Sequence, residues 1–322
     1  MSVVDGARAI ADPIGFEVVK NGLEALADEL AITIVRTAHS QVVRDNMDFS
    51  TAICDAQGRV VAQGCGIPLH LGALPDALAT LTRVYAGNIN EGDVFILNDP
   101  DQGGMHLPDI FVVKPVFHGA TRMGYAACIA HYADIGGRVA GGNAVDSTEI
   151  FQEGLQIPLL KLYDAGRRNE TLVAILRRNV RIPDVVLGDL DAQLAACHVG
   201  EAGLVALAER YGDESLAAYM DQLLSYSEQR LRAELSAMPD GEYAFEDFID
   251  DDGFGSGPIR IAVTLSIDGD RLVADFAGTS PQVRSALNAT ASFTRAAVYA
   301  GVRCVVSDDI PTMSTPAAQR SG

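Results

Sequence analysis

The spacing of the apolar residues changes along this chain, and that change limits the folds it can adopt. Over residues 15–38 apolar side chains recur every three or four positions, as they do on one face of an amphipathic helix. From residue 48 to residue 130 short apolar runs alternate with glycine-rich turns, which is typical of strands. A long helical stretch follows at 170–237, and from residue 242 the period becomes two. This arrangement predicts an α+β fold.

The chain divides into three predicted regions. An N-terminal sheet-and-helix region occupies 1–165, a helical segment occupies 166–238, and an antiparallel β unit with a terminal helix occupies 239–322. Pro183 and Gly212 are expected to interrupt the helical segment. The predicted helices cover 15–38, 75–85, most of 170–237, and 292–304. The predicted strands cover 48–54, 59–62, 93–97, 110–116, 123–130, 243–249, 259–267 and 271–276.

The chain is strongly acidic, which argues against a nucleic-acid partner. It has 24 basic and 43 acidic residues, and its formal net charge is -19. Binding a polyanion needs a basic surface, and the arginines clustered at 167–181 are better explained as a solvated helix face. Apolar residues make up 48% of the chain, which is enough for a sizeable core.

The cysteines and the N-terminus indicate the compartment. Five cysteines stand at positions 54, 65, 128, 197 and 304 without CxxC spacing, so a disulfide framework is not expected. The first fifteen residues lack the basic and apolar regions of a signal peptide. No apolar run approaches the ~20 residues that span a bilayer. These features predict a cytoplasmic protein that does not cross a membrane.

Two short clusters hold the residues best suited to chemistry. The segment NDPDQGGMHLPDI lies between two predicted strands, and its prolines and glycines place His106 and Asp109 in a loop or extended turn. The segment HYADIGG directly follows the strand at 123–130 and places His131 three residues before Asp134. Two His-x-x-Asp units, each at a strand end beside glycines, indicate a site assembled at one rim of a sheet.

Two interpretations of these units stay open. Imidazole and carboxylate ligands together suit a divalent ion such as Mn, Fe or Zn, and the lack of cysteine in both units argues against a structural zinc site. For either unit alone, a polar turn in which the aspartate caps backbone N–H groups is the better explanation. For the two units together, the polar turn and the metal site remain equal alternatives.

Other candidate sites are weaker. His70 in PLHLGALP either lines the site or packs at the start of a helix, and packing is the simpler interpretation. The glycine-rich run 253–257 joins two strands and follows three aspartates, which favours a hairpin loop over a phosphate site. The sequence has no Walker A motif, no GxGxxG motif and no nucleophile elbow. An ATP site is therefore not expected within this chain.

In their order, these motifs resemble the hydantoinase B/oxoprolinase family. The pattern NDPxxGGxHLPDI, then a strand, then HxADIGG is similar to that family, as are DFSTAICDAQGRVVAQG, PLHLGALP, EGDVFILNDP, GLQIPLLKL and DFAGTSPQVRSALNAT. The resemblance covers roughly residues 14–311. The family includes B subunits of N-methylhydantoinases, the corresponding half of 5-oxoprolinase, and large subunits of acetone and acetophenone carboxylases.

The resemblance implies a set of site residues. The positions that hold a metal in relatives correspond here to Asp45, His106, Asp109 and His131, and Asp134 would orient His131. Relatives usually carry glutamate where this chain has Asp45, so the shorter carboxylate is expected to reach a metal less well or not at all. Asp134 and His70 are the candidates for a catalytic role.

The resemblance also implies a division of labour. A separate hydantoinase A-like subunit would bind ATP–Mg and phosphorylate the substrate. This chain would hold the divalent metal (Mn, Zn or Fe) and complete the hydrolysis of a cyclic amide, such as a hydantoin, 5-oxoproline or a lactam. A subunit of an acetone- or acetophenone-type carboxylase is the alternative enzyme within the family. An inactive truncated remnant that only binds a partner subunit is the alternative from a different functional class.

The C-terminal end departs from the family pattern. Family members usually extend beyond the equivalent of residue 311, whereas this chain continues into a short polar tail. The resemblance therefore implies a truncated chain whose last apolar helix lacks its usual cover. Exposed apolar surface drives association, so we expect poor solubility or oligomers, and weak catalysis even where metal binding survives.

Overall fold

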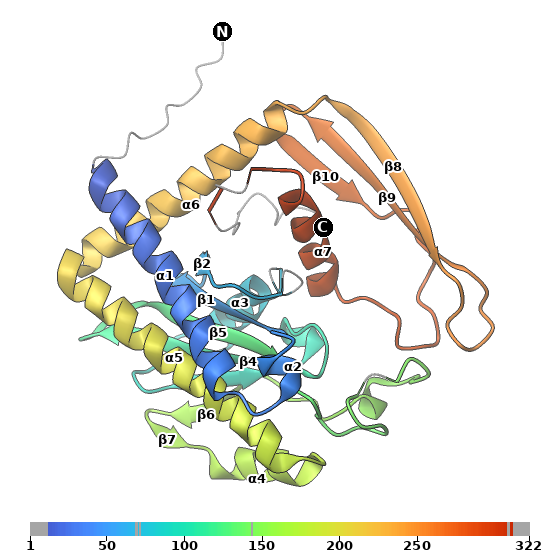
Figure 1. Cartoon of the computed structure of the whole chain (residues 1–322), viewed down its shortest axis with the longest axis horizontal. Coiled ribbons are helices and arrows are strands. Elements are labelled where there is room, and N and C mark those ends of the chain that lie inside the picture. Colours follow the sequence, from blue (N-terminus) through green and yellow to red (C-terminus); the bar gives the residue numbers. More distant parts are fainter. Residues whose placement is uncertain (1–11, 68–69, 71, 143, 308–309, 312–322) are drawn as a thin grey trace.

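The computed structural model describes residues 12–67, 70, 72–142, 144–307 and 310–311, and its larger sheet has seven antiparallel strands (Figure 1). The strand order is β2-β1-β5-β4-β3-β6-β7. These strands are β1 (Phe49–Asp55), β2 (Val60–Gln63), β3 (Val94–Leu97), β4 (Asp109–His118), β5 (Thr121–His131), β6 (Leu160–Asp164) and β7 (Arg167–Arg168). Two expectations concern segments that lie largely outside the described residues. These are the lack of a signal peptide at the N-terminus and the truncated tail at the C-terminus.

The central strands are buried on both faces, which explains their continuous apolar runs. Successive residues of a strand point to opposite faces. In β5, Cys128 contributes to the core on one face of the sheet, and its neighbours Ala127 and Ile129 contribute to the core on the other. The α+β prediction is confirmed, with a sheet that is covered by helices on both sides.

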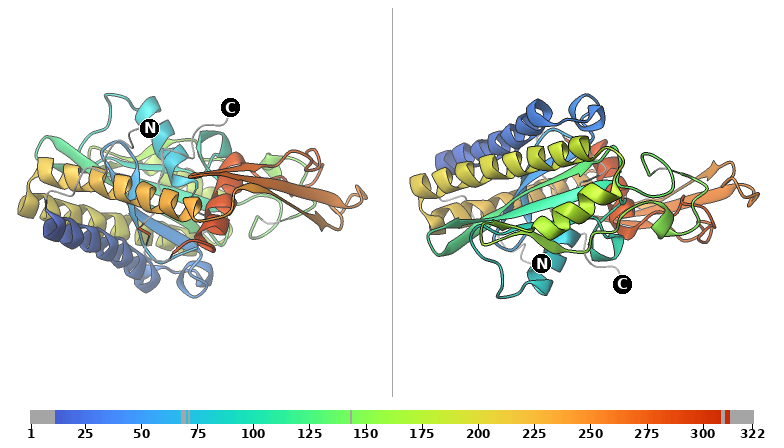
Figure 2. Two further views of the ribbon diagram at one scale, coloured as in Figure 1. Left: turned by 90° about the horizontal axis from the view of Figure 1, so that it is seen from above. Right: turned by 90° about the horizontal axis from the view of Figure 1, so that it is seen from below.

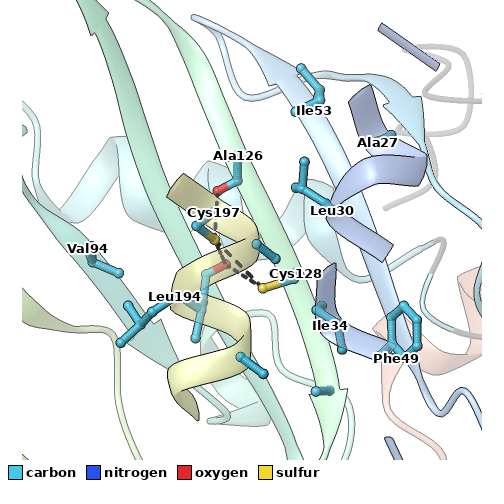
Figure 3. Packing of buried hydrophobic residues seen from close by; sticks show 14 of the residues in the cluster. Ala27, Leu30, Ile34, Phe49, Ile53, Val94, Ala126, Cys128, Leu194 and Cys197 are labelled. Carbon is cyan, nitrogen blue, oxygen red and sulfur yellow. Dashed lines mark hydrogen bonds between the residues drawn. The ribbon is translucent and has the colours of Figure 1, made fainter. Parts of the chain in front are cut away.

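Helices α1 (Pro13–Thr37) and α5 (Pro183–Tyr211) cover one face of this sheet. Figure 3 shows Leu30 and Ile34 of α1 beside Phe49 and Ile53 of β1, with Cys197 of α5 next to Cys128 of β5. The opposite face is covered by α3 (Leu74–Val84), whose buried leucines pack in the second core cluster. Burial of these apolar stripes is the main force that holds the helices to the sheet.

The helical segment divides where the sequence predicts it. Pro183 occupies the first turn of α5, where its missing N–H removes no helical hydrogen bond. Gly212, with φ +82°, separates α5 from α6 (Asp213–Ser236). The shorter α4 (Glu170–Asn179) precedes both. Helix α6 leads from α5 towards the second sheet (Figure 1).

The second sheet has three strands in the order β10-β9-β8 within the described part of the chain. These are β8 (Gly241–Ile249), β9 (Ile259–Asp268) and β10 (Arg271–Asp275), and they project away from the main body (Figure 2). Nearly every residue of β8 is exposed. The last helix, α7 (Ala291–Arg303), returns towards α3, where Arg295 and Ser292 pair with Asp76. No helix among the described residues is long and apolar enough to cross a bilayer.

Strands β6 and β7 were not expected from the sequence. Both are short, only one residue of β6 is buried, and Ala165 and Gly166 turn the chain between them with positive φ. Such short, half-exposed edge strands carry little alternation to recognise. The division at 165 and 238 stays a prediction, although the core beneath α1 joins side chains of the sheet to side chains of α4, α5 and α6.

Candidate metal centre

Asp109 and His131 face each other because of the register between β4 and β5. Asp109 begins β4, His131 ends β5, and the two residues are partners in the ladder. Directly paired residues of antiparallel strands project from the same face. His131 Nδ1 consequently lies 2.8 Å from Asp109 Oδ1.

His106 lies beside Asp109 and His131 because of a hydrogen-bonded turn that precedes β4. The N–H of Asp109 donates to the carbonyl of His106 at 2.8 Å, which closes the turn. Asn98, the fully buried residue after β3, donates its amide to the carbonyls of Leu107 (2.6 Å) and Leu155 (2.9 Å). A buried amide with these partners fixes the path of the loop. These hydrogen bonds therefore hold the backbone next to His106 in place.

The three side chains form one group of potential ligands. The rings of His106 and His131 are stacked with their centroids 5.5 Å apart. One ligand atom from each of His106, Asp109 and His131 lies within 4.8 Å of the others. Asp109 is buried, while both imidazoles are partly exposed, so solvent or a ligand can approach the group from one side.

The electrostatics of the two imidazoles differ. Burial lowers the pKa of His106, and the opposing charge of Asp109 does not overcome it. Burial also lowers the pKa of His131, but its hydrogen bond to Asp109 and the charge of that carboxylate outweigh burial and raise the pKa overall. The neutral form, which binds metals, is therefore easier to reach at His106 than at His131 in the absence of an ion.

Asp134 pairs with Arg181 in this structure, whereas the family resemblance implies that it orients His131. Its carboxylate, 2% exposed, accepts hydrogen bonds from the backbone N–H of Arg181 and from the Arg181 guanidinium (2.9 Å). The same guanidinium donates to the carbonyls of Gly136 (3.1 Å) and Gly137 (2.7 Å). The described residues include no hydrogen bond from Asp134 to His131. Asp134 thus anchors the loop that follows His131, and its catalytic role stays a prediction.

His70 is buried beside a serine and close to the ligand group. Its Nδ1 lies 2.9 Å from Ser50 Oγ, and that hydroxyl also donates to the carbonyl of Ile67 at 3.0 Å. Burial lowers the pKa of His70, and the charge of Asp109 acts against this shift. Ser50 stands two residues after Asp48, whose carbonyl accepts a hydrogen bond from the His131 N–H, so His70 packs at the end of β1 that pairs with His131. His70 thus both lies by the site and packs in the interior.

Asp45 is not among the residues whose ligand atoms lie within 4.8 Å of one another. It follows the short helix α2 (Gln41–Arg44), and its half-exposed carboxylate forms a two-pronged pair with the Arg44 guanidinium at 2.8 and 3.1 Å. This pairing lowers the pKa of Asp45. The assignment of Asp45 as a ligand, which rested on resemblance alone, stays a prediction.

Asp48 lies beside His131, and the sequence analysis did not single it out. The pairing of Phe49 with Ala130 continues to Asp48, whose carbonyl accepts a hydrogen bond from the His131 N–H at 2.9 Å. Burial is the largest influence on the pKa of His131, His106 and His70, and it lowers all three. The charge of Asp48 is among the influences that raise these pKa values. The signal was available, because Asp48 also stands at a strand end.

Comparisons with known proteins identify the family of this chain. The family model described as hydantoinase B/oxoprolinase matches residues 12–316. A putative D-/L-hydantoinase B-type subunit of Pseudomonas sp. (strain NS671) is 34% identical over 84% of this chain and 48% of its own length. The beta chain of caprolactamase from Pseudomonas jessenii is 36% identical over 90% of this chain and 50% of its own length.

Solved structures agree with this result. The crystal structure of the ATP-dependent caprolactamase from Pseudomonas jessenii matches with a TM-score of 0.86 and 35% identity over 92% of this chain and 51% of that one. Nucleotide-free acetone carboxylase matches with a TM-score of 0.87 at 19% identity, over 94% of this chain and 42% of that one, which shows a shared fold. The chain spans about half the length of the hydantoinase and caprolactamase relatives. By its family model, sequence relatives and fold, the chain belongs to the hydantoinase B/oxoprolinase family.

Proposed function

We propose that this chain is the metal-binding catalytic part of an ATP-dependent amidohydrolase that opens a small cyclic amide. The observation that carries the proposal is the convergence of His106, Asp109 and His131 at one strand end. Two imidazoles and a carboxylate are a donor set that suits Mn, Fe or Zn. Three protein ligands are also the usual number in catalytic sites, where a further position is left for water or substrate.

The chemistry expected at this group is electrophilic. When bound, a divalent metal would polarise an amide carbonyl or lower the pKa of a bound water. Asp48 is well placed to add a second carboxylate, because it lies beside His131 and its charge acts on all three histidines. On this proposal the half-exposed Asp45, already paired with Arg44, is the weaker candidate.

His70 is the proposed acid–base residue. We propose that the single hydroxyl proton of Ser50 goes to the Ile67 carbonyl, 3.0 Å away, so that the hydroxyl accepts a hydrogen bond from His70 Nδ1. This assigns the proton of the neutral ring to Nδ1 and leaves Nε2 as a hydrogen-bond acceptor. A base held in this way can take a proton from a water or from the substrate during ring opening.

We propose that a partner subunit binds and uses the ATP. Two sequence relatives are named as the B and beta members of multi-subunit enzymes, and a structural relative is named as ATP-dependent. This chain's own sequence has no phosphate-binding loop. We therefore assign ATP–Mg and substrate phosphorylation to a hydantoinase A-like subunit, and hydrolysis to the group around His106.

A cyclic amide is favoured over a ketone as the substrate. The caprolactamase relative, whose name specifies a lactam, is 36% identical to this chain. The acetone carboxylase structure is only 19% identical, and a likeness at that level supports a shared fold and not a shared substrate.

The test is turnover with a co-expressed A-like subunit. The complex should open hydantoin, 5-oxoproline or caprolactam only when ATP and a divalent metal are present. His106→Ala should abolish turnover and metal retention. His118→Ala is the matched control, because His118 ends β4 about 30 Å from Asp109 along the strand. Turnover that survives in the His106→Ala complex, or in a metal-stripped one, would contradict the proposal.

A further inference from the structure

Helix α5 carries a row of three buried side chains, a carboxylate, an amide and a thiol, on one of its faces. Asp189, Gln193 and Cys197 are spaced four residues apart, so they lie on one face of the helix. Their exposed fractions are 1%, 0% and 0%. Buried amides and carboxylates are costly unless they are hydrogen-bonded, so the partners of this row show what it contributes.

Gln193 joins the two strands that carry the ligand group. Its Nε2 donates to the carbonyl of Ile110 at 2.9 Å, and its Oε1 accepts from the Tyr132 hydroxyl at 2.8 Å. Ile110 directly follows Asp109, and Tyr132 directly follows His131. One buried amide is therefore bonded to the neighbours of both facing ligands.

The location of this bridge is significant because strand pairing ends there. Asp109 and His131 form the terminal pair of the β4–β5 ladder, and beyond it the N–H of Tyr132 still reaches the carbonyl of Pro108 at 2.8 Å. The ends of paired elements open most readily. The two hydrogen bonds of Gln193 next to this pair limit how far the His131 imidazole and the Asp109 carboxylate can separate.

Asp189 makes a similar contact one turn earlier on α5. Its Oδ1 accepts from the backbone N–H groups of His39 (2.8 Å) and Ser40 (2.9 Å). Ser40 caps α2, and the chain then leads to Asp48 at the edge of the site. The same helix face thus fixes a third segment that reaches the ligand group.

We infer that Gln193 is a positioning residue, which holds Asp109 and His131 at the spacing that a metal requires. Asp189 supports it by holding the segment that leads to Asp48. This inference rests on the proposed metal centre and adds to it the residues that preorganise its ligands. Partners of this kind typically change metal affinity by about 10–100-fold when they are removed.

The test compares Gln193→Leu with Cys197→Ala. Cys197 is equally buried one turn away on the same face, but its Sγ contacts the carbonyls of Val112 (3.9 Å) and Ala126 (3.6 Å), further from the ligand end. Both variants remove a buried contact between α5 and the sheet. Only the first removes a tie to the residues beside the ligands.

The probe is Co²⁺ alone, added to the metal-free chain and followed by its visible absorption spectrum. We expect Gln193→Leu to weaken Co²⁺ binding by about 10-fold or more and to alter the spectrum. We expect Cys197→Ala to bind Co²⁺ as the wild type does, even where its unfolding midpoint falls by a similar amount. Tyr132→Phe removes a single hydroxyl and should weaken binding in the same direction, which keeps the test available where Gln193→Leu does not fold.

The outcomes separate this inference from the proposed function. If the wild type binds Co²⁺ and the Gln193 and Tyr132 variants bind it equally well, the positioning role is refuted while the metal centre stands. If Cys197→Ala weakens binding as much as Gln193→Leu, the effect comes from lost packing, and the inference also fails. If the wild type itself binds no Co²⁺, the proposed metal centre is wrong and the inference falls with it.

Discussion

The close approach of α5 to the sheet depends on Gly200, and replacing that glycine is a sensitive test of the packing. A Cβ added at Gly200 would lie 2.6 Å from the Cβ of Ala126 on β5 and 3.2 Å from the side chain of Leu30 on α1. Carbon atoms in contact are about 3.5–4.0 Å apart. The helix would have to move by about 1 Å, and overpacking of this kind costs about 1–3 kcal/mol.

Gly22 on α1 provides a matched control for Gly200→Ala. It also lies within a helix, but a Cβ added there would meet its nearest atom, in Leu207, at an ordinary 3.6 Å. Replacing a glycine within a helix with alanine raises the free energy of unfolding by up to about 1 kcal/mol, because alanine has the higher helix propensity. Because both variants gain this term, the difference between their free energies of unfolding isolates the packing cost, about 1–3 kcal/mol.

Urea unfolding followed by circular dichroism measures this difference as a shift in midpoint at constant slope. Gly22→Ala should raise the midpoint, and Gly200→Ala should leave it unchanged or lower it. If both variants raise the midpoint equally, α5 does not lie against β5 as closely as the structure indicates.

Three further predictions concern the site and the thiols. Asp48→Asn should weaken Co²⁺ binding more than Asp45→Asn, in parallel titrations, because only Asp48 lies beside the ligand group. Co²⁺ affinity should fall as the pH drops below the raised pKa of His131, because metal and proton compete for the imidazole. In the metal-free protein, protonated His131 adds to the free energy of unfolding. That contribution is complete below about pH 6.5 and is lost as the pH rises through the raised pKa. An aromatic disulfide reagent should modify Cys65 and Cys304 in the native protein and the three buried cysteines only after unfolding.

Much of the fold could be predicted from local pattern. The apolar period defined α1 and the central strands, and Pro183 and Gly212 marked the helix ends within a residue of where they lie. The ligand group was also predictable, because His106 and His131 stand beside glycines at strand ends that a sheet brings together. These features depend on short stretches of sequence, and propensity and periodicity report on short stretches.

The residues that the sequence did not reveal act over long distances along the chain. Gln193 lies 83 residues from Ile110, and no local pattern connects a glutamine in an apolar helix to a strand so far away. Asp134 was expected to orient His131, but its partner, Arg181, lies 47 residues away in the turn before α5. In both cases tertiary contacts decide the role of a polar side chain, and periodicity does not report them.

The most direct test of the account is anomalous X-ray diffraction from crystals of the chain grown with Zn²⁺ or Mn²⁺. The account predicts one strong peak bonded to the imidazoles of His106 and His131 and to the carboxylate of Asp109, at about 2.0–2.2 Å for zinc. A peak that lies elsewhere, or crystals that hold no ion at this strand end while the protein is active, would contradict the central claim.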